Sequence, residues 1–382
     1  MKNQRKILSM LLALCVMFSV LTGFTLVTAL NANNLSAETV EKASDEKAYY
    51  EEAATAVDSS KILCYVDEAE FKSKNFARRV PEQEALNTYV FQSSDGTKTV
   101  YFLDENVKYI DEDGKTVEKD ISLVAKDQGY GITQSDIGLT IPNNPNDGIS
   151  LSYFGKIVTI TPTGAKTVAV AEKKDNSVVY QGIFGANTAL RYTPLLSGVK
   201  EDIILSAYVP NASYSFTIKT DGLNLYNNEN GCYLGKDADA VLFNLGDIIV
   251  YDAVGKLSDG SISVTTIKAG TEYIVTVSVD NDFLSDPTTV YPVTIDPSIT
   301  VSDNTHGAGA IEDAPIFAGY ATRNFGTYLY NRMGTPSANY GIGRTVVKLS
   351  GLINSHAYQS ITANQITNVS FYAKESSGGN TE

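Results

Sequence analysis

From about residue 87 onward, short apolar runs alternate with turn signals. Runs rich in β-branched and aromatic residues lie at 98–103, 151–160, 203–209, 214–219, 261–267 and 272–279. Within 273–279 large apolar side chains alternate with smaller ones, as they do in a strand with one face in solvent. Asp-Gly pairs, which tolerate the positive φ angles of tight hairpins, separate several of the runs. The pattern predicts an all-β fold of antiparallel β-sandwich modules.

The same runs give an expected core. Residues two apart in a strand point to the same face. We therefore expect the core to draw on Tyr101, Leu103, Val158, Ile160, Ile204, Phe216, Ile218, Val275 and Val277.

The N-terminus has the layout of a secretory signal peptide. Lys2, Arg5 and Lys6 precede an uncharged stretch at 7–30, and small residues that suit cleavage follow. A retained membrane anchor is the alternative, because the uncharged stretch is long enough to cross a bilayer. Gly23 and nearby Ser and Thr residues weaken its second half, which favours cleavage. We predict a signal peptide at 1–37 and an extracellular, secreted or cell-wall-associated protein with no membrane contact after cleavage.

Composition divides the remaining chain into three parts. Residues 38–86 begin with an acidic, Ala-rich tract and are predicted to be an acidic linker. Residues 87–298 carry the strand pattern and form the predicted β-sandwich surface region. A boundary follows at Asp296-Pro297, because Pro297 cannot donate to a central ladder. Beyond it the chain is richer in Gly, Asn, Thr and Tyr, so 299–382 is predicted to be a separate β-module.

Net charge and cysteine content bear on the partners of the chain and on its disulfides. The chain has 44 acidic and 30 basic residues and a net charge of −14, which argues against a nucleic-acid partner, because phosphate binding needs clustered Lys and Arg. Cys64 and Cys232 remain after cleavage of the signal peptide. They could form a disulfide in an oxidising compartment or stay as two buried thiols.

The sequence offers little for catalysis. His306 and His356 are the only histidines, and each lies in a loop-like stretch without a neighbouring nucleophile motif. A zinc site of the His-Glu-x-x-His type is also missing. We therefore predict no catalytic residues, no metal ligands and no enzyme.

Calcium is the one cofactor for which the sequence has candidate ligands, and these are two short acidic runs that match a calcium loop only weakly. Asp111-Glu112-Asp113-Gly114 is followed by Lys115 where a further oxygen ligand is needed, so a hairpin turn is the better interpretation. Asp280-Asn281-Asp282 with Asp286 is a second weak candidate, which also suits a loop at a strand end.

Three stretches resemble the region that precedes the repeats in bacterial RHS or wall-associated surface proteins. They are Val107-Lys108-Tyr109-Ile110-Asp111-Glu112-Asp113-Gly114-Lys115, then Leu190-Arg191-Tyr192 with Gly198-Val199-Lys200-Glu201-Asp202-Ile203-Ile204-Leu205, and Val290-Tyr291-Pro292-Val293-Thr294-Ile295-Asp296-Pro297. The resemblance covers 87–298 loosely and implies an extracellular protein.

The C-terminal part resembles the opening half of a DNRLRE domain. Asp303 suits the opening strand end, and Asn324-Phe325-Gly326 suits the Asn-x-Gly element. The segment 341–349 resembles the Gly-x-x-Arg-Thr-x-x-Lys-Phe strand, with Leu349 where Phe is usual, and 365–372 resembles a later strand. The resemblance implies a jelly-roll-like module, carbohydrate binding in some relatives and no catalysis. A full domain of this kind is longer, so the module is expected to be truncated and the chain to be a fragment.

Aromatic residues in this module are candidates for ligand binding. Tyr320, Tyr328, Tyr330 and Tyr340 lie among Asn, Arg and Thr residues. Flat rings with polar neighbours suit the apolar faces and hydroxyls of sugars, so a polysaccharide or cell-wall glycan is a candidate partner. The alternative is that these rings fill the core or rim of the module.

Three functions remain open on this basis. The first is a non-enzymatic structural or adhesive surface protein, forming the N-terminal part of a larger polypeptide. The second is a carbohydrate-binding module array of an extracellular polysaccharide-degrading enzyme. The third is the display segment of a polymorphic toxin. All three require export and β-sandwich modules.

Overall fold

The computed structural model describes residues 24–25, 62, 66, 68–103, 105–166, 171–228, 231–238, 240–246, 248–301, 312–320, 343–348, 366, 368 and 372–373. Apart from the two-residue strand β1 (Phe24–Thr25), which pairs with β27 (Tyr372–Ala373), the predicted signal peptide lies outside these residues. None of the helices among the described residues has the length and hydrophobicity of a membrane span.

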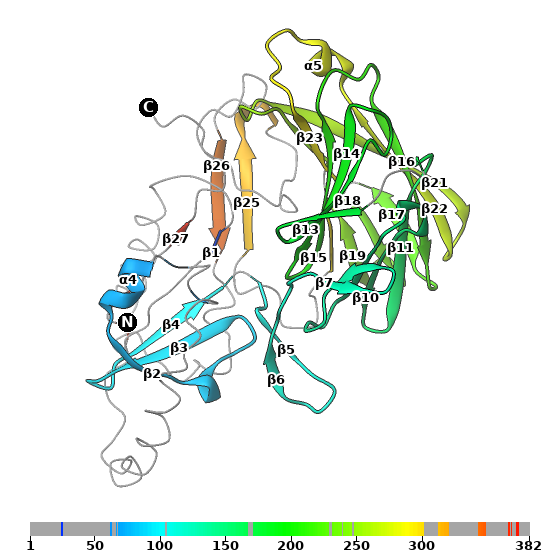
Figure 1. Ribbon diagram of the computed structural model, residues 1–382. Helices are drawn as coiled ribbons and strands as arrows, with labels where there is room; N and C mark the ends of the chain where they lie inside the picture. Colours follow the sequence, from blue (N-terminus) through cyan, green and yellow to red (C-terminus); the bar gives the residue numbers. More distant parts are fainter. Residues whose placement is uncertain are drawn as a thin grey trace.

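The main body is a β-sandwich, which confirms the predicted fold class (Figure 1). Its strands pair antiparallel throughout the described residues and form two sheets. The first sheet contains, in spatial order, β7 (Val124–Lys126), β8 (Gly129–Gly131), β9 (Gly138–Pro142), β10 (Ile149–Tyr153), β11 (Lys156–Pro162), β16 (Ser213–Thr220), β22 (Glu272–Val279) and β21 (Leu257–Lys268).

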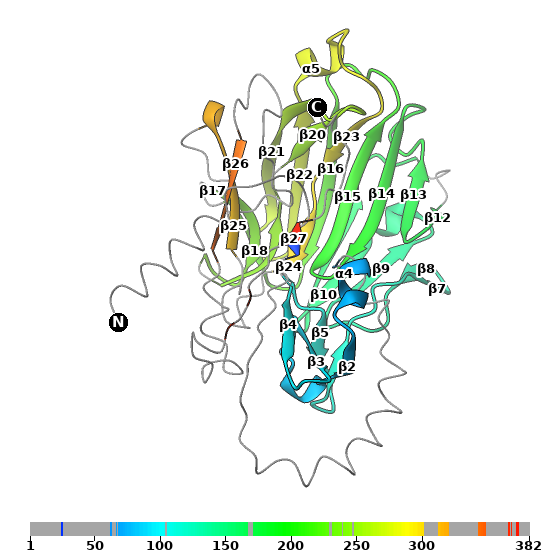
Figure 2. The same cartoon turned by 90° about the vertical axis from the view of Figure 1, so that its left-hand side faces the viewer.

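The second sheet begins with β12 (Ala171–Lys174), β13 (Ser177–Gln181), β14 (Thr188–Leu195) and β15 (Gly198–Leu205). Two short strands share the next position and pair with β15, namely β23 (Val293–Asp296) and β24 (Ile299–Val301). β23 then pairs with β20 (Ile249–Tyr251), while β24 pairs with β19 (Val241–Leu245), and β18 (Gly231–Gly235) and β17 (Asn224–Asn228) follow. Figure 2 shows β12–β15 as a fan of neighbouring strands.

One long strand joins the two sheets. β21 pairs with β20 through Leu257–Asp259, and from Gly260 onward it pairs with β22. A Cβ at Gly260 would lie 2.1 Å from the side chain of Ile248, so the absence of a side chain lets the strand pass this corner.

The core lies between the two sheets and follows the alternation of the strands. In β22 every second residue is buried, as the sequence pattern predicts. Of the nine predicted core residues, eight are buried: six lie between the two sheets, whereas Tyr101 and Leu103 lie in the separate apolar cluster of the residues that precede the sandwich. Ile204 is the exception, because its neighbours Ile203 and Leu205 occupy the inner face of β15 and Ile204 faces outward.

A smaller unit precedes the sandwich. It contains α4 (Glu68–Ser73), β2 (Phe76–Arg79), η2 (Pro81–Gln83), β3 (Thr88–Ser93), β4 (Lys98–Phe102), β5 (Lys108–Ile110) and β6 (Thr116–Glu118). β2, β3 and β4 form one sheet and β5 and β6 a hairpin. The boundary predicted at residue 87 therefore falls inside this sheet, between β2 and β3.

Short elements complete the described chain. They are η3 (Pro145–Asp147), α5 (Asn281–Ser285), β25 (Glu312–Phe317), η4 (Ala318–Tyr320) and β26 (Gly343–Lys348). β25 and β26 pair with each other, and β26 lies within the strand predicted at 341–349. β24 lies beyond the boundary predicted at residue 298 but belongs to the sandwich.

Candidate functional site: a charged cluster between paired strands

The predicted sugar-binding tyrosines fall mostly outside the described residues. Tyr320 is the last residue of η4, whereas Tyr328, Tyr330 and Tyr340 are not described. His306, His356 and Cys64 also lie outside. Cys232 is buried, without a disulfide partner among the residues that the structure describes.

Both weak calcium candidates serve as turns and caps. One carboxylate oxygen of Asp111 accepts the backbone N–H groups of Asp113 (3.0 Å) and Lys115 (2.8 Å), which closes the β5–β6 hairpin. Asp280 accepts the N–H of Asp282 (2.9 Å) at the start of α5. Among the described residues no group of three or more His, Cys, Asp or Glu side chains is placed to hold a metal ion.

A different candidate site lies where two of the segments that resemble wall-associated surface proteins pair with each other. The segment 198–205 is β15, and the segment 290–297 contains β23, which pairs with it. The register sets Ile203 opposite Ile295 in the core. On the outer face the same register brings Lys200 and Asp202 next to Asp296.

Lys200 lies between the two aspartates of this cluster. Its Nζ contacts Oδ1 of Asp202 and lies 2.7 Å from Oδ2 of Asp296. Both aspartate side chains are fully buried, and Lys200 is 13% exposed. The ammonium group therefore pairs with two carboxylates at a site from which water is largely excluded.

Each aspartate has a second partner, and the two partners differ. Arg191 on β14 donates from Nε (2.9 Å) and Nη2 (2.7 Å) to Oδ2 of Asp202. Asp296 instead accepts a hydrogen bond from the hydroxyl of Ser298 at 2.6 Å. Asp202 thus has two cationic neighbours, whereas Asp296 has Lys200 and a neutral hydroxyl.

These surroundings have different effects on the charged groups. Burial raises the pKa of Asp296, against the lowering effect of Lys200. Burial opposes the charge of Arg191, but attraction and hydrogen bonding to Asp202 outweigh it and raise the pKa of Arg191. Asp296 is therefore the carboxyl group of the cluster that burial biases toward its protonated form.

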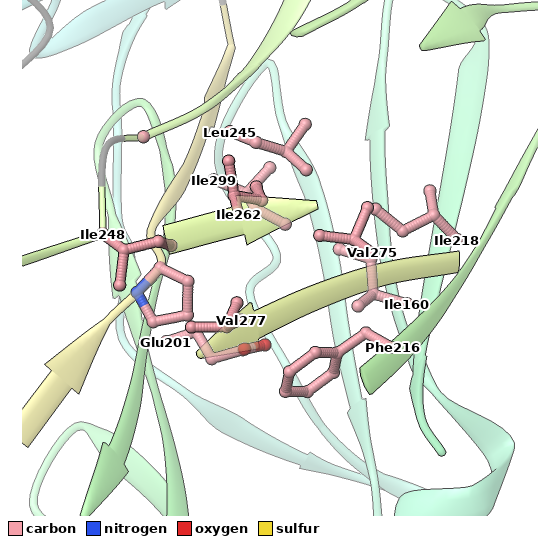
Figure 3. A pocket seen from close by; sticks show the side chains of 12 residues that line it. Ile160, Glu201, Phe216, Ile218, Leu245, Ile248, Ile262, Val275, Val277 and Ile299 are labelled. Carbon is pink, nitrogen blue, oxygen red and sulfur yellow. The ribbon is translucent and has the colours of Figure 1, made fainter. Parts of the chain in front are cut away.

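The opposite face of β15 carries a third buried carboxyl group. Glu201 is 3% exposed and borders a cavity of about 20 Å³, large enough for roughly one water molecule. Figure 3 shows its carboxyl group directed between Val277 and Phe216. The cavity lining is mainly apolar, and its other members are Ile160, Ile218, Leu245, Gly246, Ile248, Ile262, Val275, Pro297 and Ile299.

Glu201 is held in a largely apolar environment. Burial raises its pKa to about 8, against a smaller lowering by the hydroxyl of Tyr192. Oε2 of Glu201 and the hydroxyl of Tyr192 have no partner at full hydrogen-bond geometry in the described part of the chain. Burial therefore favours the protonated form of Glu201 in the folded protein at neutral pH.

A second charged network holds the smaller unit together. Glu84 is 2% exposed, and Arg79 donates to both of its oxygens at 2.8 and 2.7 Å. Lys108 on β5 lies 3.1 Å from the same carboxylate, and its Nζ is 4.1 Å from the ring centre of Tyr89. Burial lowers the pKa of Lys108 to about 8, despite attraction to Glu84. This network joins the β2–β4 sheet to the β5–β6 hairpin.

Comparison with known proteins gives distant relatives over part of the chain. No family model matches it, and no solved structure matches it significantly. It is 27% identical over 170 residues to the tRNA3(Ser)-specific nuclease WapA of Bacillus spizizenii and to the tRNA nuclease WapA of Bacillus subtilis strain 168. The tRNA(Glu)-specific nuclease WapA of Bacillus subtilis subsp. natto gives the same values. The match covers 43% of this chain and 7% of each relative.

These names contradict the prediction that the protein is not an enzyme, because all three relatives are named as nucleases. The prediction relied on motifs within 382 residues, whereas the chain matches only a small part of each relative. Over part of its length, the chain is similar to tRNA nucleases named WapA.

Proposed function

We propose that this chain is the exported β-sandwich region of a wall-associated, toxin-type polypeptide with tRNA nuclease activity. The similarity to three tRNA nucleases named WapA carries the proposal. The chain spans only about 7% of the length of these relatives, so we assign it export and display at the cell surface and assign tRNA cleavage to the whole polypeptide.

Two features of the chain support this role. The basic residues Lys2, Arg5 and Lys6 before a long uncharged stretch suit export. The sandwich has an extensive core, and its antiparallel strands continue from β7 to β24. A folded β domain of this kind suits display outside the cell.

The location is tested with an epitope inserted at Gly114, the exposed tip of the β5–β6 hairpin. We expect the epitope to be labelled on intact cells and to be recovered in the wall fraction after muramidase digestion. The matched control lacks residues 1–37 and should stay inside the cell. Recovery of the full-length chain only from the cytosol would overturn the proposed location.

The nuclease role is tested separately by co-culture. Cells that produce the whole polypeptide are grown with labelled neighbours, and the tRNA of the neighbours is examined for cleavage. We expect cleavage that depends on residues 124–301 in the producing cells. Wall recovery without any tRNA cleavage would reject the nuclease role and leave the surface location standing.

A further inference from the structure

The cluster of Lys200, Asp202 and Asp296 on the outer face of β15 and β23 places an amine against a carboxyl group where little solvent is present. Nζ of Lys200 lies 2.7 Å from Oδ2 of Asp296, on two adjacent antiparallel strands. Asp202 contacts the same Nζ from the other side. The three side chains are between 0% and 13% exposed, so little water competes for these groups.

We propose that Lys200 and Asp296 form a covalent amide bond that links β15 to β23, with Asp202 as the proton-transferring residue. Asp296 is the reacting carboxyl group because it has no arginine partner among the described residues and burial favours its protonated form. Asp202 is the proton acceptor because it contacts the same Nζ from the other side and is itself held in place by two hydrogen bonds from Arg191.

The reaction needs no further reactant. The Lys200 ammonium first gives a proton to Asp296, which leaves a neutral amine and a carboxylic acid; burial favours this neutral pair over two ions. The Nζ lone pair then attacks Cγ of Asp296. A second proton passes from Nζ through Asp202 to the departing oxygen of Asp296. The Cγ–O bond breaks, one water molecule leaves, and the third hydrogen remains on the amide nitrogen.

The amide bond would be a permanent covalent cross-link between β15 and β23. Lys200 and Asp296 are separated by about 100 residues. Most of the strands that follow β14 in the chain lie between them. A cross-link between them closes that loop covalently, as a disulfide would, but resists reduction. This inference concerns the fold of the chain and does not depend on the proposed wall or nuclease role.

The test is the intact mass of the purified, denatured chain, followed by sequencing of its tryptic peptides. We expect the wild-type mass to be lower than the sequence mass by one water molecule. We also expect a branched peptide that joins Lys200 to Asp296. Lys200→Arg, which keeps the charge but has no primary amine, and Asp296→Ala should both restore the full mass. Asp202→Asn should slow or abolish the bond, so that most of the chain has the full mass.

A matched control uses the ion pair between Lys256 and Asp286. It has the same N–O distance, 2.7 Å, but its side chains are 32% and 36% exposed. Lys256→Arg should therefore keep the mass deficit of the wild type. A wild-type chain with the full sequence mass and no branched peptide would overturn the proposal, whatever the variants do. A mass deficit that survives in Lys200→Arg would also overturn it.

Discussion

Glu201 combines three conditions at one residue: deep burial, a cavity of about 20 Å³ and a mainly apolar lining. An ionised carboxyl group loses its hydration in such a place and gains little in return, so the protonated form is favoured. Its strand neighbours Lys200 and Asp202 point to the other face of β15 and do not pair with it. Glu201 therefore stays protonated at pH values where an exposed glutamate is ionised.

This environment predicts a dependence of stability on pH. The folded-state pKa is about 8, and the unfolded-state pKa is about 4.3. The folded chain binds the extra proton between these values, so the free energy of unfolding falls as pH rises from about 4.3 to 8 and is level above. The contribution of Glu201 to this fall is on the order of a few kcal/mol.

Glu201→Gln should remove this contribution, because glutamine is close in shape and does not ionise. Urea unfolding at pH 5 and pH 8 measures the difference. We expect the variant to lose less stability than the wild type between the two pH values and to be the more stable protein at pH 8. Glu112→Gln at the exposed hairpin is the control and should follow the wild type. Equal pH slopes for Glu201→Gln and the wild type would contradict the prediction.

At the scale of elements, β15 is the central strand of the second sheet. It pairs with β14 on one side and with both β23 and β24 on the other. The pairing with β24 requires a close backbone approach at its first residue. A Cβ on Gly198 would lie 2.1 Å from the carbonyl oxygen of Ile299. Glycine is therefore needed at this position for reasons of space.

Gly198→Ala should destabilise the sandwich, because β24 has to move away from β15. We expect a loss of about 1–3 kcal/mol in the free energy of unfolding, measured by urea titration. Gly246→Ala is the matched control: its Cβ would lie 3.4 Å from the carbonyl oxygen of Ser298, so only a small change is expected. A Gly198→Ala variant as stable as Gly246→Ala would show that the strands tolerate the closer contact.

The elements also show what local sequence can predict. The alternation in 272–279 gave both the strand and its buried face. In 198–205 charged residues occupy both faces, since Lys200 and Asp202 point outward and Glu201 points inward. The apolar residues Ile203, Ile204 and Leu205 are contiguous, so local periodicity could not decide which of them is buried, and the choice of Ile204 was wrong.

The charged cluster could not be predicted for a related reason. Both segments that form it were singled out in the sequence, but the contact between Lys200 and Asp296 depends on the pairing register of strands about 100 residues apart. Register follows from the packing of the two inner faces and from turn geometry. Neither is a property of either segment by itself.

At the scale of the whole molecule, the smaller unit contacts the sandwich at the turn between β14 and β15. Leu196 packs against the apolar cluster of the smaller unit, which contains Ile62, Tyr89, Phe91, Tyr101, Leu103 and Val107. Next to it, the hydroxyl of Ser197 donates to Glu105 at 2.5 Å. Lys119 donates to the carbonyl oxygen of Leu196 at 3.1 Å and pairs with Asp136 at 2.7 Å.

These contacts predict that the smaller unit can be loosened without unfolding the sandwich. Leu196→Ala removes apolar contacts to the cluster, and since Leu196 is half-buried the cost should be about 1–2 kcal/mol. Hydrogen exchange should become faster in β3 and β4 and stay unchanged in β14 and β22, because a local opening exposes only the unit that has lost its contact.

Val254→Ala, at an exposed turn 68% accessible to solvent, is the control and should leave exchange unchanged throughout. Two outcomes would contradict the prediction. Equally faster exchange in β3, β4, β14 and β22 would mean that the smaller unit and the sandwich open as one cooperative body. Unchanged exchange in β3 and β4 would mean that Ser197, Glu105 and Lys119 hold the smaller unit without help from Leu196.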